Sequence, residues 1–431
     1  MKLAEIIEKY IPGDWGNEVP GNENPYQVSC IRGADIVPIE NVDYSEIPYR
    51  YISERSYNTR LLSVGDIIIE KSGGSPTQST GRVSIVTEDL LKERQNIVCS
   101  NFCEAFRVKS SWNPWYVYYY FRFIYDQGVF FNFEGKTSGL KNLQMDNAFS
   151  SIEIEEFDRS IQDKVANAIL DLDTKIAINH QINRKLEAMA KQLYDYWFVQ
   201  FDFPDSNGRP YKTTGGKMVW NETLKREIPE GWEDKRISEC IHPFERGISY
   251  SSDDIKKGIG TPMINLACFD KQGNYRTGEL KYFFGEYDSE FLVYPDDMLI
   301  ATTDMTRNAD IIGTPIWVNR EHESFLFTTD LVRLVPKDDV QPSFIYFTLK
   351  DKSYHKYIKP FASGTNVMHL NVQGIMDYKF AYAPHKIQES FENHYKAIKK
   401  RQDQCINEMN SLKELKGFIL PLLMTGQVTI G

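Results

Sequence analysis

The 431-residue sequence lacks a long apolar run, and we expect no secretory leader. Its longest aromatic run, Trp115 to Tyr125, is interrupted by Arg122 and is too short to span a bilayer. The N-terminal segment MKLAEIIEKYIPGDW contains no apolar core of the kind that directs secretion. We therefore expect a cytoplasmic protein that makes no membrane contact.

Positive charge is also in deficit, because 50 Lys and Arg residues face 60 Asp and Glu residues, which gives a net charge of −10. A whole-chain basic signal for nucleic acid is therefore missing. Any contact with nucleic acid must come from local groups of side chains. An acidic surface can belong to the side that faces a protein partner.

Cysteine is scarce and scattered, at positions 30, 99, 103, 240, 268 and 405. Only Cys99 and Cys103 lie close together, and no second pair or neighbouring histidine completes a zinc set. We expect reduced thiols and no metal site.

Catalytic motifs are missing as well. Asn113-Pro114-Trp115-Tyr116 is similar to the Asn-Pro-Pro-Tyr motif of amino-methyltransferases, but the second proline is absent, and no glycine-rich loop follows a strand to hold S-adenosylmethionine. Helix capping accounts for this segment. Asp296 and Asp297 resemble half of a nuclease carboxylate cluster, but no Glu-x-Lys follows, so we interpret them as acids at a strand edge.

What the sequence does contain is a duplication. Five landmarks recur in the same order, at offsets of 217, 231, 228, 225 and 226 residues. They are Ile11–Trp15 with Ile228–Trp232, Gly65–Ile69 with Asp296–Ile300, Asn113–Tyr118 with Gln341–Tyr346, Ser138-Gly139 with Ser363-Gly364, and Ile161-Gln162 with Ile387-Gln388. Repeats of this kind indicate two copies of one structural unit.

Each copy has the same predicted plan. Short apolar runs, Asp66–Glu70 and Val83–Val86 in the first copy and Met298–Ala301 and Leu331–Val335 in the second, predict strands. The 25 Tyr and 25 Phe residues favour β-rich units with aromatic cores. Pro114 and Pro342 each predict the first turn of a short helix.

A long helix closes each copy, with apolar residues repeating every seven positions. The helix-pairing positions are Val165, Leu172, Asn179, Leu186 and Leu193 in the first helix and Phe391, Ile398, Cys405, Leu412 and Ile419 in the second. A second seam contains Ile182, Met189, Leu415 and Leu422. Such a stripe must bury against another helix, and the other copy is the economical partner. Asn179 is either a tolerated polar residue or one that fixes the register.

Polar loops follow equivalent strands in the two copies. Lys71–Arg82 is rich in small and hydroxyl residues, which allow backbone N–H groups to approach phosphates and Arg or Gln to reach base edges. The counterpart is Thr302–Asn308, and a second pair of turns lies at 135–142 and 363–369. These are either plain surface loops or nucleic-acid contacts, and their recurrence favours contacts. The DNA-binding candidates are Lys71, Ser72, Gly73, Gly74, Thr77, Gln78, Thr80, Arg82, Lys136, Thr137, Ser138, Lys141, Asn142, Thr302, Thr303, Thr306, Arg307, Asn308, Ser363, Thr365, Asn366 and His369.

The plan resembles the specificity subunits of Type I restriction-modification systems over nearly the whole chain. The resemblance is carried by Ile31–Ile36, Gly65–Ile69, Gly73–Pro76 with Gly81–Val83, Leu186–Tyr194 with Trp197–Val199, Phe201–Pro204 leading into Ile228–Trp232, and Leu420–Leu423 with Gly426–Val428. Asp304-Met305-Thr306 departs from the family's glycine-rich loop, so the contacts of the second copy are less well defined.

The resemblance implies an α+β chain with two target recognition domains, joined by two long helices that pair as an antiparallel coiled coil. The implied domains are 1–156 and 227–384, with helices in 157–202 and 385–431 and a linker at 203–226. Each domain reads one half of a bipartite, asymmetric site in double-stranded DNA. The helices bind two methylation subunits, and restriction subunits join the complex. S-adenosylmethionine, ATP and Mg²⁺ then belong to those partners, and this chain has no cofactor and no catalytic residue.

The length of the first long helix agrees with two recognition domains that read separate half-sites. A helix over 165–197 is about 50 Å long at ~1.5 Å per residue, which spans roughly 15 base pairs. Two alternatives stay open at this stage. One is a stand-alone methyltransferase or nuclease with a fused recognition domain, and the other is a scaffold that binds only protein.

Overall fold

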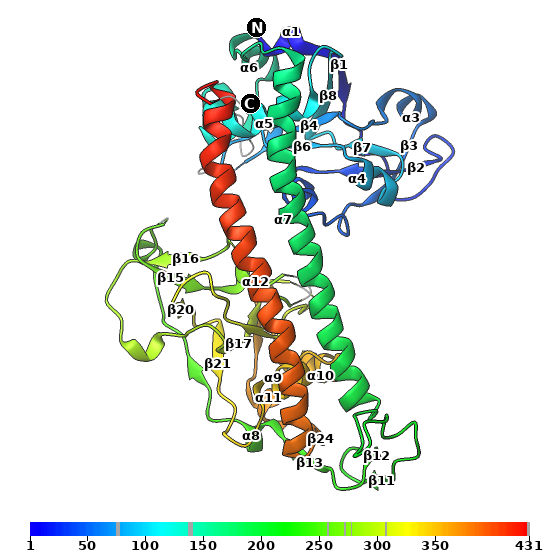
Figure 1. Ribbon diagram of the computed structural model, residues 1–431, viewed down its shortest axis with the longest axis vertical. Helices are drawn as coiled ribbons and strands as arrows, with labels where there is room; N and C mark the ends of the chain where they lie inside the picture. Colours follow the sequence, from blue (N-terminus) through cyan, green and yellow to red (C-terminus); the bar gives the residue numbers. More distant parts are fainter. Residues whose placement is uncertain are drawn as a thin grey trace. The chain divides into compact units, whose positions relative to one another are not determined.

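A computed structural model describes residues 1–74, 78–136, 141–256, 258–270, 273–276, 278–306 and 308–428. The chain divides into two compact units (Figure 1). Unit 1 comprises Met1–Arg184 and Gln404–Gly431, and unit 2 comprises Lys185–Asp403. Each unit takes part of both long helices, whereas the sequence analysis set the helices apart as separate segments.

Unit 1 combines short strands with helices. Its strands are β1 (Ile7–Pro12), β2 (Tyr26–Ile31), β3 (Tyr49–Ile52), β4 (Ile67–Glu70), β5 (Ser72–Gly73), β6 (Val83–Ile85), β7 (Ile97–Cys99), β8 (Cys103–Val108), β9 (Glu134–Lys136) and β10 (Lys141–Leu143). Its helices are α1 (Leu3–Ile6), α2 (Ile36–Glu40), α3 (Glu54–Arg60), α4 (Glu88–Glu93), α5 (Pro114–Asp126) and α6 (Met145–Ser151).

Unit 2 is built in the same way. Its strands are β11 (Met218–Asn221), β12 (Arg226–Pro229), β13 (Glu233–Arg236), β14 (Glu245–Arg246), β15 (Thr261–Ile264), β16 (Lys281–Phe283), β17 (Met298–Ala301), β18 (Thr303–Asp304), β19 (Pro315–Trp317), β20 (Leu326–Phe327), β21 (Leu331–Leu334), β22 (Ala362–Ser363), β23 (Met368–Leu370) and β24 (Lys379–Tyr382). Its helices are α8 (Ile237–Cys240), α9 (Pro342–Leu349), α10 (Lys352–Ile358) and α11 (Gln373–Asp377). The long helices α7 (Arg159–Tyr194) and α12 (His385–Met424) contribute to both units.

Three sheets of unit 1 have counterparts in unit 2 with the same strand order. The order β1-β8-β4-β6 matches β14-β21-β17-β19, the order β3-β2-β7 matches β16-β15-β20, and the order β5-β10-β9 matches β18-β23-β22. The directions agree too, because β2 and β15 each pair antiparallel with one neighbour and parallel with the other. The predicted duplication and the α+β class are confirmed.

The predicted elements lie close to their expected positions. Strand β17 occupies the predicted Met298–Ala301, and β4, β6 and β21 differ from their predicted ranges by one residue at one end. Helices α5 and α9 begin at Pro114 and Pro342. The Asn113 side chain accepts hydrogen bonds from the backbone N–H groups of Trp115 and Tyr116, so its role is helix capping, as the sequence indicated.

A buried glutamine ties the short helix to the long helix in each unit. Gln162 accepts a hydrogen bond from the Asn113 N–H at 2.8 Å and donates to the Phe157 carbonyl at 2.8 Å. Gln388 accepts from the Gln341 N–H at 3.2 Å and donates to the Ala383 carbonyl at 2.7 Å. Both glutamines are buried, so these bonds satisfy the buried Asn113 N–H and Ala383 carbonyl as well as the half-buried Gln341 N–H and Phe157 carbonyl.

The long helices pack antiparallel within each unit. In unit 1, Lys416 of α12 donates to Asp173 of α7 at 2.6 Å, and Leu420 and Leu423 share a core with Val165 and Ile169. In unit 2, Tyr194 packs on Phe391, and Gln402 donates to Glu187 at 3.4 Å. The burial of these side chains supplies most of the energy that holds the helices in place.

The ten helix-pairing positions are all buried or half-buried. The second seam is only partly enclosed, because Ile182 and Leu422 are half-buried but Met189 and Leu415 are 56% and 47% exposed. The prediction is therefore wrong for Met189 and Leu415. The second buried position lies four residues after the first, at Ile169, Ile176 and Ala190 of α7 and at Tyr395 and Met409 of α12, so Met189 and Leu415 face outward.

The segment between the units' recognition folds is itself folded. Residues 203–226, expected as a linker, contain β11 and the turn into β12. Phe203 stacks on Tyr211 and Trp232, and Asp202 accepts hydrogen bonds from Thr213. The segment thus adds to the core of unit 2.

Candidate nucleic-acid interface

A small three-stranded sheet gathers the predicted loops in each unit. In unit 1, β10 pairs with β5 and β9, and this places Lys141 opposite Gly73 and Asn142 opposite Ser72. In unit 2, β23 pairs with β18 and β22, and this places His369 opposite Thr303 and Ser363. Candidates that lie about 70 residues apart in sequence are therefore neighbours in each unit.

Three candidate cations of unit 1, Lys71, Arg82 and Lys141, are paired with glutamates. The Lys71 ammonium lies 2.9 Å from Glu104, and the Lys141 ammonium lies 2.9 Å from Glu134. The Arg82 guanidinium donates two hydrogen bonds to Glu70, at 2.7 and 2.8 Å. This bonding raises the pKa of Arg82. Arg82 is thus held inside the unit, although the sequence had suggested that it reaches base edges.

The other unit 1 candidates form the surface around these pairs. Ser72 donates to the Asn142 side chain, and Thr80 donates to Glu134 from its N–H at 2.8 Å and from its hydroxyl at 3.2 Å. Gly74 and Gln78 are exposed. Thr77, Thr137 and Ser138 lie outside the described residues, as does the side chain of Lys136.

The unit 2 candidates divide into internal and exposed groups. Thr303 is buried, the Thr302 hydroxyl donates to the Asp330 carbonyl at 2.8 Å, and the Thr306 hydroxyl accepts from the Asp310 N–H at 3.1 Å. Exposed residues are Asn308, Ser363, Thr365, Asn366 and His369, together with Met305, which is 73% exposed. Arg307 lies outside the described residues. The exposed face therefore presents amide, hydroxyl, imidazole and thioether groups.

Two ion pairs at equivalent places support the sheets beneath these loops. Asp66 receives two hydrogen bonds from Arg107, at 2.8 and 2.9 Å, and one from the Ser63 N–H. Asp297 receives one from Arg333 at 3.0 Å and one from the Tyr294 N–H. We call these the framework pairs. Sequence reasoning missed them, since each aspartate lies just before one strand while its arginine lies on another strand, about 40 residues away.

The nuclease-like acids of the sequence analysis thus have structural partners. Asp297 belongs to a framework pair, and Asp296 forms ion pairs with Arg320 and Lys399. Both carboxylates are engaged by cations of their own unit, as expected for acids at a strand edge.

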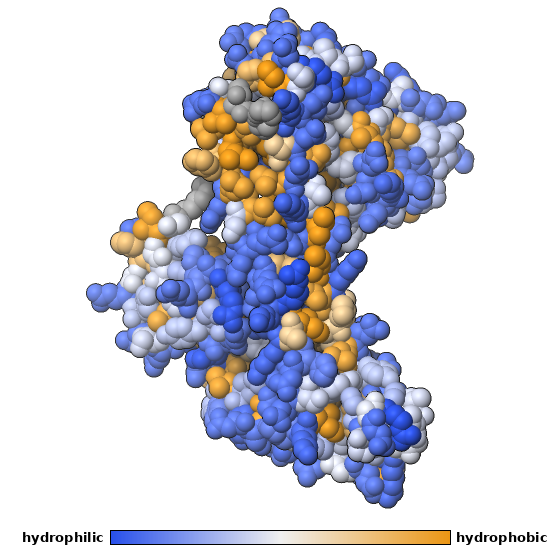
Figure 2. All heavy atoms as spheres, in the orientation of Figure 1, coloured by the Kyte–Doolittle hydropathy of each residue, from blue (hydrophilic) through white to orange (hydrophobic). Residues whose placement is uncertain are grey.

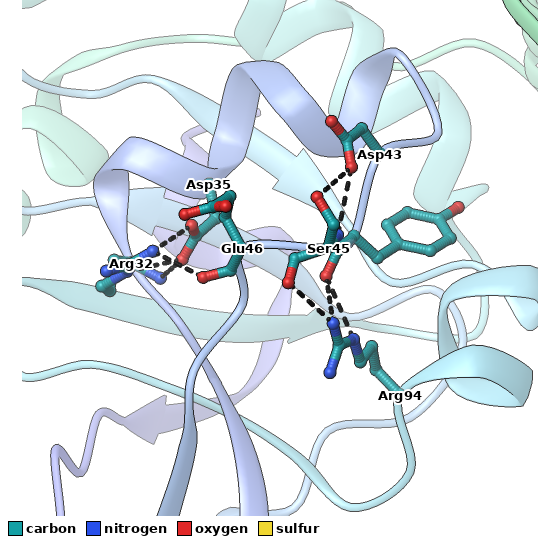
Figure 3. A network of polar contacts seen from close by, with 7 residues as sticks. Arg32, Asp35, Asp43, Ser45, Glu46 and Arg94 are labelled. Atoms are coloured by element: carbon teal, nitrogen blue, oxygen red, sulfur yellow. Dashed lines mark hydrogen bonds and ion pairs between the residues drawn. The ribbon is translucent and has the colours of Figure 1, made fainter. Parts of the chain in front are cut away.

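The Ile31–Ile36 motif of the sequence analysis forms a tight polar network (Figure 3). Arg32 donates to Asp35 at 2.7 Å and to the Glu46 carbonyl at 2.8 Å, and Arg94 donates to the Ser45 carbonyl at 3.0 Å. These bonds fix the segment before β3. The same motif also makes room for a neighbouring side chain, because Gly33 has no Cβ that would meet the carboxylate of Glu70.

A cavity of about 720 Å³ opens in unit 1 between α5, α7 and α12. Its walls include Trp115 and two ion pairs, Arg122 with Glu40 and Lys416 with Asp173. None of the described DNA-binding candidates lines this cavity. The small sheets, and not the cavity, therefore form the candidate interface. Within the described ranges, no helix combines the length and apolarity needed to cross a membrane.

The arrangement defines a class of protein, a duplicated α+β fold in which each unit combines a polar small sheet with parts of two paired long helices. Comparison with known sequences identifies one domain of this kind. Residues 229–414 match the sequence model of the Type I restriction modification DNA specificity domain. This stretch of the chain is therefore assigned to the specificity domain of Type I restriction-modification systems.

Individual relatives agree with this assignment. The specificity subunit of the Type I restriction enzyme MjaIX of Methanocaldococcus jannaschii is 22% identical over 442 residues, covering 97% of this chain and 95% of that protein. The specificity subunit of the HindI enzyme of Haemophilus influenzae is 22% identical over 335 residues, covering 65% of this chain and 70% of that protein. The crystal structure of the Type I system S subunit from M. genitalium matches with a TM-score of 0.51 at 15% identity, over 98% of this chain and 95% of that one, which shows the same fold.

Proposed function

We propose that this chain is the sequence-reading subunit of a Type I restriction-modification complex and that each unit reads one half of a split DNA target. The observation that carries the proposal is the duplication, since two copies of one fold each present a polar small sheet. The exposed groups differ between the copies. Two different surfaces on one scaffold suit an asymmetric target, because sequence is read by side-chain groups on base edges. DNA as the target implies a complex in the cytoplasm.

Direct readout, not phosphate attraction, is the proposed contribution of this chain. In unit 1 the candidate cations whose side chains the structure describes, Lys71, Arg82 and Lys141, are each paired with a glutamate, so little of their positive charge is left to neutralise phosphates. Basic partner subunits would supply that contribution. The purified chain should therefore bind DNA weakly, and the methylation subunit should sharpen both affinity and selectivity.

The proposed docking surface for the methylation subunits lies on the long helices. Ile178, Leu415 and Phe418 in unit 1 and Met189 in unit 2 are exposed apolar side chains on α7 and α12. Figure 2 shows apolar side chains along the visible face of α7. Exposed apolar stripes of this kind favour helix packing against a partner. We propose two methylation subunits per complex, with restriction subunits joining them.

The chain is proposed to be non-catalytic. The segment similar to a methyltransferase motif caps a helix through Asn113, and the two neighbouring acids are held in ion pairs. S-adenosylmethionine, ATP and Mg²⁺ are assigned to the partner subunits. Isothermal calorimetry of the purified chain with S-adenosylmethionine tests this, and micromolar binding would contradict it.

The experiment for the function itself is co-expression with the cognate methylation subunit in a host that has no DNA methylation of its own. Single-molecule sequencing of the host DNA then shows which bases are modified. We expect a split motif with a fixed gap that appears only when both chains are present. A stable complex that binds all DNA sequences with equal affinity would overturn the proposal.

A further inference from the structure

A buried carboxylate lies at the base of the candidate loop in unit 1. Glu70 ends β4, is 3% exposed, and binds the Arg82 guanidinium through both oxygens. Two glycines make room for it, because a Cβ at Gly33 or at Gly73 would lie 2.6 Å from Glu70 Oε1. Arg82 closes the loop that begins after β5, so the pair joins the two ends of that loop.

The backbone around this carboxylate is the same in unit 2. The Glu70 N–H donates to the Arg82 carbonyl and the Gly81 N–H donates to the Glu70 carbonyl, at 2.8 and 2.9 Å. In unit 2 the Ala301 N–H donates to the Thr314 carbonyl and the Gly313 N–H donates to the Ala301 carbonyl, at 3.2 and 2.8 Å. These bonds align Glu70 with Ala301 and Arg82 with Thr314, so unit 2 has neither member of the ion pair.

Unit 2 supplies a carboxylate from a different position. Gly73, the second residue of β5, aligns with Asp304, the second residue of β18. A side chain at position 73 would point at the Glu70 carboxylate, and the alanine at 301 leaves that space open for Asp304. Asp304 is 0% exposed and accepts hydrogen bonds from the Thr306 and Ile311 N–H groups, both at 2.7 Å. Each unit thus has one buried carboxylate at the base of its loop.

The framework pairs, in contrast, are present in both units. Asp66 with Arg107 and Asp297 with Arg333 occupy equivalent places at the other end of β4 and β17. The two units therefore share the bond that holds the sheet but differ in the bond that holds the loop. A buried carboxylate is expensive unless its hydrogen bonds are complete, so it restricts the loop to conformations that complete them.

We infer that Glu70 with Arg82 in unit 1, and Asp304 in unit 2, are positioning residues that fix the loops through which each unit reads its half of the DNA target. We call these groups the loop anchors. They do not touch DNA themselves. The inference rests on the proposed function and adds the groups that set the selectivity of each half. Because the anchors differ in chemistry, the loops of the two units can differ in sequence and conformation while their sheets remain the same.

The test compares Glu70→Gln with Asp66→Asn in the full chain, co-expressed with the methylation subunit. Both substitutions replace a buried acid of β4 or its flank by its amide, and both weaken a bidentate bond to arginine. Only Glu70→Gln acts on a loop anchor. The readout is the extent of methylation at every base of a plasmid library with both half-sites randomised, together with the yield of intact complex.

We expect Glu70→Gln to reduce discrimination about tenfold at bases of one half-site, which corresponds to the loss of roughly one good base contact, and to leave the other half-site unchanged. Arg82→Lys keeps the charge and should retain part of the discrimination. Asp66→Asn should lower complex yield without changing base preference. Equal base preferences in Glu70→Gln and wild type, or the same change in Glu70→Gln and Asp66→Asn, would overturn the inference. A wild-type complex without a split motif would instead overturn the proposed function.

Discussion

Unit 1 and unit 2 use the same sheets to hold loops of different chemistry. Their three sheets have the same strand order, and their framework pairs occupy the same places. The loops are anchored differently, by a side-chain ion pair in unit 1 and by backbone hydrogen bonds to Asp304 in unit 2. Different groups therefore hold the sheets and the loops in this fold, the framework pairs for the sheets and the loop anchors for the loops.

The largest effect is expected from Asp304→Ala. Its removal leaves the Thr306 and Ile311 N–H groups without their acceptor at an enclosed site, and bonds to a charged acceptor contribute about 1.5–3 kcal/mol each. We expect unit 2 to lose about 3–5 kcal/mol and selectivity to fall at one half-site only. Urea unfolding and the methylated motif measure these effects. Asn308→Ala, at an exposed site in the same loop, is the control for stability alone, and equal losses of unfolding free energy in the two variants would contradict the anchor role.

The next largest effect is a difference between the two framework pairs in how much each contributes to the free energy of unfolding. Asp66 is 0% exposed, whereas the side chain of Asp297 is 21% exposed and Arg333 has a second partner in Glu245. We expect Asp66→Ala to cost about 3 kcal/mol and Asp297→Ala about 1.5 kcal/mol, because water screens the more exposed pair. Urea midpoints of the two variants check this, and a larger loss for Asp297→Ala would contradict the comparison.

A smaller effect, equal in the two units, is expected at the buried glutamines. Gln162→Leu and Gln388→Leu each leave one N–H and one carbonyl without a partner. Each should cost about 2 kcal/mol. Thermal unfolding of both variants measures it. A difference between them of more than about 1 kcal/mol would show that the two junctions are not equivalent.

The smallest effect concerns acid stability. Burial, with Lys413 and Arg184 nearby, lowers the pKa of His180 to about 4, and burial with Lys359 lowers the pKa of His355. The unfolded chain, with a histidine pKa of about 6.5, then binds more protons, so stability falls as pH drops below that value. His180→Gln should reduce this loss more than His355→Gln. The urea midpoints of unfolding are measured at pH 7 and at pH 5 for the wild type and both variants. If the midpoint of His180→Gln falls between these pH values as much as that of the wild type, the assigned role of His180 is contradicted.

The fold was largely predictable because its signals are local. Pro114 and Pro342 marked the short helices, and the seven-residue repeat marked the long ones. The second long helix extends to Met424 and includes Pro421, so this proline does not end it. Met189 and Leu415 carry the right residue type but face outward, which depends on how the helices pack.

The candidate site was predictable only in outline. The loops and their recurrence could be found in the sequence, but the role of Arg82 could not, because its partner Glu70 lies across a strand pair. Asp304 was noted only as a departure from a glycine-rich loop. Its function depends on an alanine three residues earlier, which leaves the space that a glutamate fills in unit 1. Such an exchange of positions is visible only when the two backbones are aligned by their hydrogen bonds.

In the proposed function, each unit reads its own half of the DNA target. The most direct measurement compares Asn142→Ala with His369→Ala, since these residues occupy equivalent places on β10 and β23. Each variant is co-expressed with the methylation subunit, and the methylated motif is sequenced. We expect Asn142→Ala to change base preference in one half-site and His369→Ala to change it in the other. A change in the same half-site for both variants, or a uniform loss of methylation without altered preference, would contradict it.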